Sequence, residues 1–304
     1  MVNKECLAPL HISGNMTELQ NVQLQEHLGE AVHTAYRTVV EQLDRQSAQL
    51  VLDLDQQFRD EVANIVAAII LRHTVSDKYR DEEAGSTRVY PPTYRVWPVE
   101  GQVSELRKVF PGLGNCMEKL GHKTPPEGAE DWFAIPRWQA LAPTYNEAVE
   151  KVLEILATRR RFSNRIAERL GPAYLRQSER SKLAEKILAE QQPGNDILVV
   201  AAQAGLRHRG RSARRARVSL VSNEFGLGVF AIGCMLLTHP ERLSNGDTLM
   251  IDCGGDEYSV RGDSTFDRVP LLDYDLSGTE FSVFYDDRAR NLWGMPTAFL
   301  FKMP

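Results

Sequence analysis

The chain has 304 residues, of which 42% are hydrophobic and 25% charged, and its formal net charge is −5. These fractions are typical of a globular protein rather than a disordered one, and the length allows one large core or two domains. The weakly acidic total excludes polyanion binding by bulk electrostatics, so such binding would need a local basic patch.

Cysteine usage and apolar run lengths indicate the cellular setting. The four cysteines lie far apart and form no CxxC pair: Cys6, Cys116, Cys234 and Cys253. This pattern favours a reducing compartment over a disulfide framework or a cysteine zinc site. Met1 to Leu10 lack the apolar core of a signal peptide, and the run from Phe225 to Leu237 is shorter than the roughly 20 residues that cross a bilayer. We expect a cytoplasmic protein with no membrane association and no cofactor.

The N-terminal part of the chain has a helical pattern. From Glu30 to Ala84 there is neither glycine nor proline, and apolar residues recur three or four positions apart. This spacing predicts one helix from Glu30 to His73, or two helices broken near residues 44–47. Residues 1–90 would form a helical arm that pairs with a partner protein or a second copy, or else a core hairpin. Residues 91–304 would form an α+β body.

Two further helices are expected in the middle of the chain. Thr144 and Glu147 have capping-box spacing, and the apolar pattern after them predicts a helix that continues to Gly171. On that helix Arg161, Arg165 and Arg169 would share one face, because they are four residues apart. A second helix is predicted from Pro172 to Glu190.

After Gly194 the pattern changes from helical to strand-like. Ile197 to Ala202 reads as a buried strand, and Ser212 is placed to cap a short helix from Ala213 to Val221. Alternating residues near 249–253 and 281–285, and the segment 298–301, predict further strands. The expected fold class is therefore α+β, with a helical N-terminal half that contains a long helix or helical hairpin, and a β-rich C-terminal third.

The most unusual local composition lies between these strands. No acidic residue occurs from Ile197 to Asn223, and residues 158–217 carry a net charge of +10. Arginine pairs bidentately with phosphate, so we predict a non-catalytic protein that binds a DNA or RNA backbone, as part of a protein complex. The predicted nucleic-acid-binding residues are Arg161, Arg165, Arg207, Arg209, Arg211, Arg214, Arg215 and Arg217.

Three alternatives remain open. The arginines could pair internally with the acids of the C-terminal third, in a structural or protein-interaction subunit. Asp252, Asp256 and Glu257 could hold Mg²⁺ in a nuclease, because carboxylates after a strand suit that ion. His239 and Cys253 could form a base and nucleophile pair. A glycine and aspartate turn needs no metal, and nothing in the sequence fixes the distance from His239 to Cys253, so we predict no metal site and no catalytic residue.

Overall fold

The computed structural model describes residues 78–301, apart from Glu168 and Ser277, and a few isolated positions before residue 50. Residues 79–304 form one compact unit. The predicted helix or hairpin between Glu30 and His73, and the self-association or partner binding assigned to it, lie outside the described residues.

The first sheet contains four strands in the order β1 (Asp131–Pro136), β4 (Ile197–Gln203), β11 (Thr297–Phe299) and β5 (Glu224–Gly226), and each neighbouring pair is antiparallel. Every residue of β4 is buried, so both faces of this strand are covered. The continuous apolar run at 197–202 produces this burial, and the strand predicted there is confirmed.

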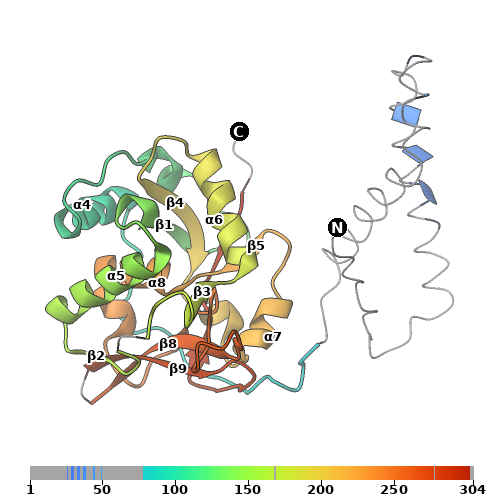
Figure 1. Ribbon diagram of the computed structural model, residues 1–304. Helices are drawn as coiled ribbons and strands as arrows, with labels where there is room; N and C mark the ends of the chain where they lie inside the picture. Colours follow the sequence, from blue (N-terminus) through green and yellow to red (C-terminus); the bar gives the residue numbers. More distant parts are fainter. Residues whose placement is uncertain are drawn as a thin grey trace. The chain divides into compact units, whose positions relative to one another are not determined.

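Helices lie on both sides of this sheet (Figure 1). The helices α4 (Val99–Val109) and α8 (Val229–Thr238) pack against β1, and α5 (Tyr145–Arg159) packs against α8. On the other side α6 (Glu179–Gln191) packs against β4 and β5. The close contact between α5 and α8 depends on Gly233, where a Cβ would lie 2.4 Å from a methyl carbon of Val152. A side chain at that position would therefore force Val152 or the helices themselves to shift.

The second sheet contains seven strands, mostly from the C-terminal part of the chain. Its main path runs β10 (Trp293–Gly294), β6 (Met250–Asp252), β8 (Arg268–Asp275), β7 (Asp256–Tyr258) and β3 (Leu175–Gln177). The long strand β9 (Gly278–Tyr285) forms a hairpin with β8 and also pairs in parallel with β2 (Phe162–Asn164).

Short helical segments complete the described part of the chain. They are the helix α7 (Ala213–Val218) and the 3₁₀ turns η1 (Glu118–His122), η2 (Trp138–Ala140), η3 (Leu206–His208) and η4 (Pro240–Leu243). No helix within residues 78–301, as far as they are described, is both long and apolar enough to cross a membrane.

The predicted fold class is wrong in how it distributes the elements. Within residues 78–301 the α-helices lie between residues 99 and 238 and alternate with strands that begin at residue 131, so this part of the chain is not divided into a helical portion followed by a β-rich third. The prediction placed strands only after Gly194 and therefore missed β1. In the structure β1 pairs with β4 along its whole length.

Strands also replace parts of two predicted helices. The helix that begins at Tyr145 ends at Arg159, Arg160 is extended, and Phe162–Asn164 becomes β2. The Asn164 side chain then accepts hydrogen bonds from the amides of Ile166 and Ala167, which holds a turn instead of a helix. Leu175–Gln177 likewise forms β3 inside the second predicted helix. Pairing with β9 and β7 therefore overrides local helical periodicity at both places.

The predicted capping box at the start of α5 is confirmed, and it gives a test of the fold. The Thr144 side chain accepts a hydrogen bond from the Glu147 amide, and the Glu147 side chain accepts one from the Thr144 amide. We expect Thr144→Ala to lower the free energy of unfolding by about 1 kcal/mol, measured by urea denaturation. The control Thr158→Ala, which alters a hydroxyl near the other end of α5, should cost less than about 0.5 kcal/mol. Equal losses in the two variants would contradict the assigned cap.

Candidate functional site

The arginine-rich segment connects β4 to β5 through two turns and the short helix α7. Gly205 and Gly210 have positive φ angles of 127° and 76°, which permit the turns on either side of η3. Ser212 then caps α7 through a hydrogen bond from the Arg215 amide, as predicted, although the helix ends at Val218 rather than Val221.

Three of the arginines pair with two adjacent glutamates in residues 79–88, which we call the strap. Arg214 donates from Nε to both carboxylate oxygens of Glu82 at 2.9 Å, and its Nη2 also contacts Glu82. Arg215 donates to Glu83 at 2.5 Å, and Arg211 lies 3.4 Å from the same carboxylate. These guanidinium groups therefore bind acids of their own chain.

Backbone contacts hold the strap in place beside these ion pairs. The Ala84 amide donates to the Gly210 carbonyl at 2.7 Å, and the Ser212 amide donates to the Glu82 carbonyl at 3.1 Å. A Cβ at Gly210 would lie 2.1 Å from the Ala84 carbonyl oxygen, so only glycine allows this approach. The Ser212 hydroxyl also donates to the Glu82 carboxylate at 2.6 Å.

The remaining arginines of the segment also have partners in the chain. Arg207 lies 3.2 Å from the buried carboxylate of Glu224. Arg217 lies 3.3 Å from the Asp286 carboxylate and donates to the carbonyls of residues 254 and 256. Arg209 is exposed and donates to the Arg88 carbonyl at 3.1 Å. Five of the six arginines thus have a carboxylate partner, and the sixth has a carbonyl.

A buried ion-pair and hydrogen-bond network lies beneath this segment. Glu224 and His208 are each 1% exposed and share a 2.8 Å hydrogen bond, and the Thr297 hydroxyl donates to the same Glu224 oxygen at 2.6 Å. Although burial raises the pKa of Glu224, the His208 contact and the other donors bring the net value below normal. Arg211 reaches the other ring nitrogen of His208 at 3.0 Å. The network links the segment to β5 and β11.

Sequence reasoning missed most of these partners. Internal pairing was expected with acids of the C-terminal third, but only Asp286 comes from there. Glu82 and Glu83 precede the segment by about 130 positions, and Glu224 follows it directly in β5. The one available signal was the acidic run at residues 81–83.

Arg161 and Arg165 lie outside the arginine-rich segment, and their side chains have different surroundings. Arg165 lies beyond β2 and donates to Glu280 of β9 at 2.7 Å, and Arg169 lies in a turn. The predicted stripe of Arg161, Arg165 and Arg169 does not form, because these residues are not helical. Arg161 is exposed and lines a cavity at the end of α5.

The three carboxylates of the nuclease hypothesis do not converge on one point. Asp252 accepts from Arg290 at 2.9 Å, and Glu257 accepts from Arg176 at 2.8 Å. Asp256 is fully buried and accepts from the Tyr145 hydroxyl at 2.8 Å and from the Val229 amide at 2.7 Å. Each carboxylate therefore has a separate structural partner.

His239 and Cys253 also have separate surroundings. The His239 ring accepts the Trp97 amide at Nε2, and its Nδ1 lies 2.8 Å from the Thr238 hydroxyl. Burial lowers the pKa of His239 to about 4, so the ring is neutral near pH 7. Cys253 is completely buried, and burial raises the pKa of its thiol well above normal, which disfavours the nucleophilic thiolate.

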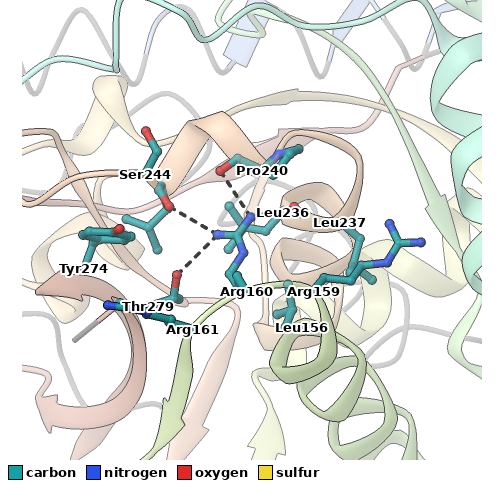
Figure 2. Close-up of a pocket in the computed structure, with 12 residues that line it drawn as sticks. Leu156, Arg159, Arg160, Arg161, Leu236, Leu237, Pro240, Ser244, Tyr274 and Thr279 are labelled. Carbon is teal, nitrogen blue, oxygen red and sulfur yellow. Dashed lines mark hydrogen bonds between the residues drawn. The ribbon is translucent and has the colours of Figure 1, made fainter. Parts of the chain in front are cut away.

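The cavity at the C-terminal end of α5 has a volume of about 500 Å³. Figure 2 shows the Arg160 guanidinium at its centre, with polar side chains on one side and leucines on the other. The lining residues are Leu156, Arg159, Arg160, Arg161, Leu236, Leu237, Pro240, Leu243, Ser244, Tyr274, Gly278 and Thr279. The Arg159 side chain extends away from this centre and pairs with Glu105 at 2.7 Å.

Arg160 differs from the arginines of the segment in the kind of partner it has. Its guanidinium donates to the carbonyls of Leu236, Pro240 and Leu243 and to the Thr279 hydroxyl, at 3.2–3.3 Å. No carboxylate among the described residues forms an ion pair with it. Burial lowers the pKa of Arg160, since the charged form is partly removed from water. A half-buried cation thus faces the cavity with only uncharged oxygens as hydrogen-bond partners, although the Glu241 carboxylate is near enough to act on it electrostatically.

Comparison with known proteins gives no assignment for this site. No family model, no curated protein and no solved structure matches the chain.

The strap contacts predict a specific response to charge removal. The hydrogen bond from Arg215 lowers the pKa of Glu83. Burial raises the pKa of Glu82, but its contacts with Arg214 and Ser212 outweigh burial, so the pKa of Glu82 is also below normal. We expect the double variant Glu82→Gln, Glu83→Gln to speed amide exchange at Ala84 about fivefold at pH 7. This corresponds to about 1 kcal/mol for partly exposed ion pairs. Hydrogen exchange with peptide mass analysis measures it.

The pH dependence of amide exchange at Ala84 and a control variant at Asp81 provide a second test of the strap ion pairs. Because both folded pKa values lie below the ordinary 4.5, the strap contacts stabilise the fold above pH 4.5 and are lost as pH falls below it. After correction for the intrinsic pH dependence of amide exchange, acid should therefore reduce the protection of Ala84 in the wild type and change that of the double variant less. Asp81→Asn alters an exposed neighbour and should behave as wild type. Unchanged exchange in the double variant would show that the ion pairs do not hold the strap.

Asp256 gives a second pH prediction, with the opposite sign. Burial raises its pKa from 3.8 to about 7, so the folded state holds this proton more tightly than the unfolded state does. Its contribution to stability is therefore present at low pH and lost as pH rises toward 7 and above. In urea unfolding, Asp256→Asn should reduce the wild-type loss of stability between pH 5 and pH 8. The exposed control Asp247→Asn should keep the full loss, and an identical loss in all three proteins would refute the assignment.

Proposed function

We propose that this protein is a non-catalytic binding protein that takes a small anionic ligand into the cavity at the end of α5. The observation that carries the proposal is the guanidinium of Arg160, which faces that cavity without a carboxylate partner among the described residues. A ligand carboxylate or phosphate would supply the missing negative charge.

The electrostatics of the site support an anion. The carbonyl of Leu236 lies in the last turn of α8, where the helix dipole supplies about half a negative charge, and the carbonyl of Pro240 lies in η4 directly after that helix. This offsets the Arg160 charge only in part. The hydrogen bonds from Arg160 to these carbonyls, at 3.2–3.3 Å, are longer than the roughly 2.7–2.9 Å that is typical between guanidinium groups and anions. An anion would therefore form stronger hydrogen bonds with Arg160 than the carbonyls do.

The size and lining of the cavity define the ligand class. About 500 Å³ is within the range of small-molecule sites. Four leucines supply an apolar wall, while Ser244, Thr279 and Tyr274 supply polar groups beside Arg160 (Figure 2). Arg161 adds a second positive charge at the rim. The lining fits an anionic head group attached to a short apolar body.

Nucleic-acid binding through the arginine-rich segment stays a prediction. It needs guanidinium groups free to leave their present partners, whereas Arg211, Arg214 and Arg215 have carboxylate partners in the strap. This pairing favours the alternative in which the segment is structural. Of the predicted nucleic-acid-binding residues, Arg161 belongs to the cavity proposed here.

Isothermal titration with a matched pair of probes tests the proposal. Hexyl phosphate carries both the anionic head and the apolar body, and hexanol lacks only the charge. We expect hexyl phosphate to bind at least about tenfold more tightly than hexanol, because charge-assisted hydrogen bonds contribute about 1.5–3 kcal/mol. Hexanoate in place of hexyl phosphate distinguishes a carboxylate from a phosphate preference. Equal binding of hexyl phosphate and hexanol would refute an anion site.

Variants locate the binding in this cavity. Arg160→Gln should weaken hexyl phosphate about tenfold or more, and Arg160→Lys should restore part of the affinity because it keeps the charge. Arg160 also donates to backbone carbonyls near the end of α8, so Arg160→Gln could unfold the protein. In that case Arg161→Gln at the rim is the test variant, and it should weaken the binding of hexyl phosphate about two- to fivefold. Arg169→Gln, exposed and outside the lining, should leave binding unchanged. Full affinity in both Arg160→Gln and Arg161→Gln would refute the location.

A further inference from the structure

A second opening lies near the other end of α5, between α6 and the turn η2. It is a groove of about 530 Å³ whose walls include Arg137, Trp138, Gln177 and Glu185. A smaller cavity of about 50 Å³, which we call the inner cavity, lies beside it and shares Gln177 and Glu185 with the groove. Neither opening contains a residue that lines the Arg160 cavity, so the two sites are independent.

Glu185 lies at the junction of the groove and the inner cavity. It comes two turns into α6, and one of its carboxylate oxygens accepts a hydrogen bond from Gln177 at 2.7 Å. No cation among the described residues forms an ion pair with it. Burial raises the pKa of Glu185, and the nearby charge of Arg137 counteracts this shift. The groove therefore ends at a carboxylate without a bonded counter-charge.

Arg137 lines the same groove and is also without a bonded counter-charge. It follows β1 directly, where its backbone amide donates to the Asp196 carbonyl at 2.7 Å and fixes the start of the η2 turn. Its guanidinium makes no hydrogen bond or ion pair with the part of the chain that the structure describes. Arg137 and Glu185 influence each other electrostatically but do not touch, so a ligand with room for two charges could bridge them.

The inner cavity beyond Glu185 is mainly apolar. Its lining includes Leu188, Leu198, Val200 and Phe230, and its polar groups include the Tyr145 hydroxyl, which already donates to Asp256. This cavity of about 50 Å³ is small, which suits the end of a small alkyl group. The site thus combines a positive group, a negative group and a small apolar pocket.

We propose that this groove binds a free α-amino acid, with its carboxylate on Arg137, its ammonium group on Glu185 and a small apolar side chain directed into the inner cavity. Charge complementarity favours this ligand over a simple anion or cation, because either one would satisfy only one of the two side chains. The remaining charges at the groove do not select one sign, since Lys182 and Lys186 are matched by Glu179 and Glu190.

Titration of the full chain with L-valine and two single-charge analogues tests the proposal. Isobutylamine lacks only the carboxylate of valine, and 3-methylbutanoate lacks only the amine. We expect L-valine to bind at least tenfold more tightly than either analogue, measured by isothermal titration at pH 7.5. No detectable L-valine binding at 10 mM, or isobutylamine binding as tightly as L-valine, would overturn the proposal.

Variants of residues that line the groove test whether L-valine binds there. Arg137→Gln and Glu185→Gln should each weaken L-valine binding at least tenfold, while Lys186→Gln, which lines the same groove but pairs with Glu190, should stay within twofold of wild type. Glu185→Gln is expected to fold, because it removes a buried charge and keeps a polar side chain beside Gln177. Wild-type affinity in both Arg137→Gln and Glu185→Gln would place valine elsewhere and overturn the assignment.

Discussion

Neutralisation of the arginine-rich segment by acids of the same chain is the interaction on which the structure of residues 79–301 depends. Six arginines within eleven positions repel one another, and no acid lies among them. The fold places Glu82 and Glu83 on one side, Glu224 beneath and Asp286 at the far end. The carboxylates come from three separate parts of the chain, so these ion pairs also hold the strap, β5 and the turn after β9 around α7.

This neutralisation shapes where ligands can bind. Where arginines have carboxylate partners, an external anion must displace an ion pair and leave a carboxylate without its partner, which is costly for a buried group such as Glu224. Arg160 and Arg137 lack such partners among the described residues and face open cavities instead. The density of arginines in the sequence is therefore a poor guide to ligand contacts here, and the partner of each arginine is a better one.

The two proposed sites share α5 as a common support. Tyr145, at its first turn, lines the inner cavity beyond Glu185, and Leu156 and Arg159, at its last turn, line the cavity of Arg160. The fifteen residues of this helix span about 22 Å at 1.5 Å per residue. The helix is held by the capping box at Thr144 and by its packing against α8 at Gly233. Both sites thus include residues of the same capped and packed helix.

Local sequence signals predicted the features that depend on neighbours in the chain. The cap at Thr144, the cap at Ser212 and the buried strand at 197–202 each follow from a few adjacent residues, and each is confirmed. The misses depend on distant contacts. Phe162 and Leu175 belong to apolar patterns that fit a helix, but β9 and β7 supply strand partners that only the tertiary structure provides.

The candidate sites show the same division between local and distant information. Arginines could be located from the sequence, but whether each has a carboxylate partner could not, because Glu82 lies about 130 positions away from Arg214. The groove of Arg137 and Glu185 had no sequence signal, since a single arginine after a strand and a single glutamate in a helix are ordinary. Cavities are properties of packing and appear only when the elements are assembled.

The guanidinium groups of residues 207–217 are occupied by the chain itself. An electrophoretic mobility shift assay with single- and double-stranded DNA and RNA, over a range of salt concentrations, tests this occupation. We expect no shift at physiological salt, and no nucleic acid in the purified protein as judged by absorbance at 260 and 280 nm. A salt-sensitive shift that is lost in the folded triple variant Arg209→Ala, Arg211→Ala, Arg215→Ala would contradict it.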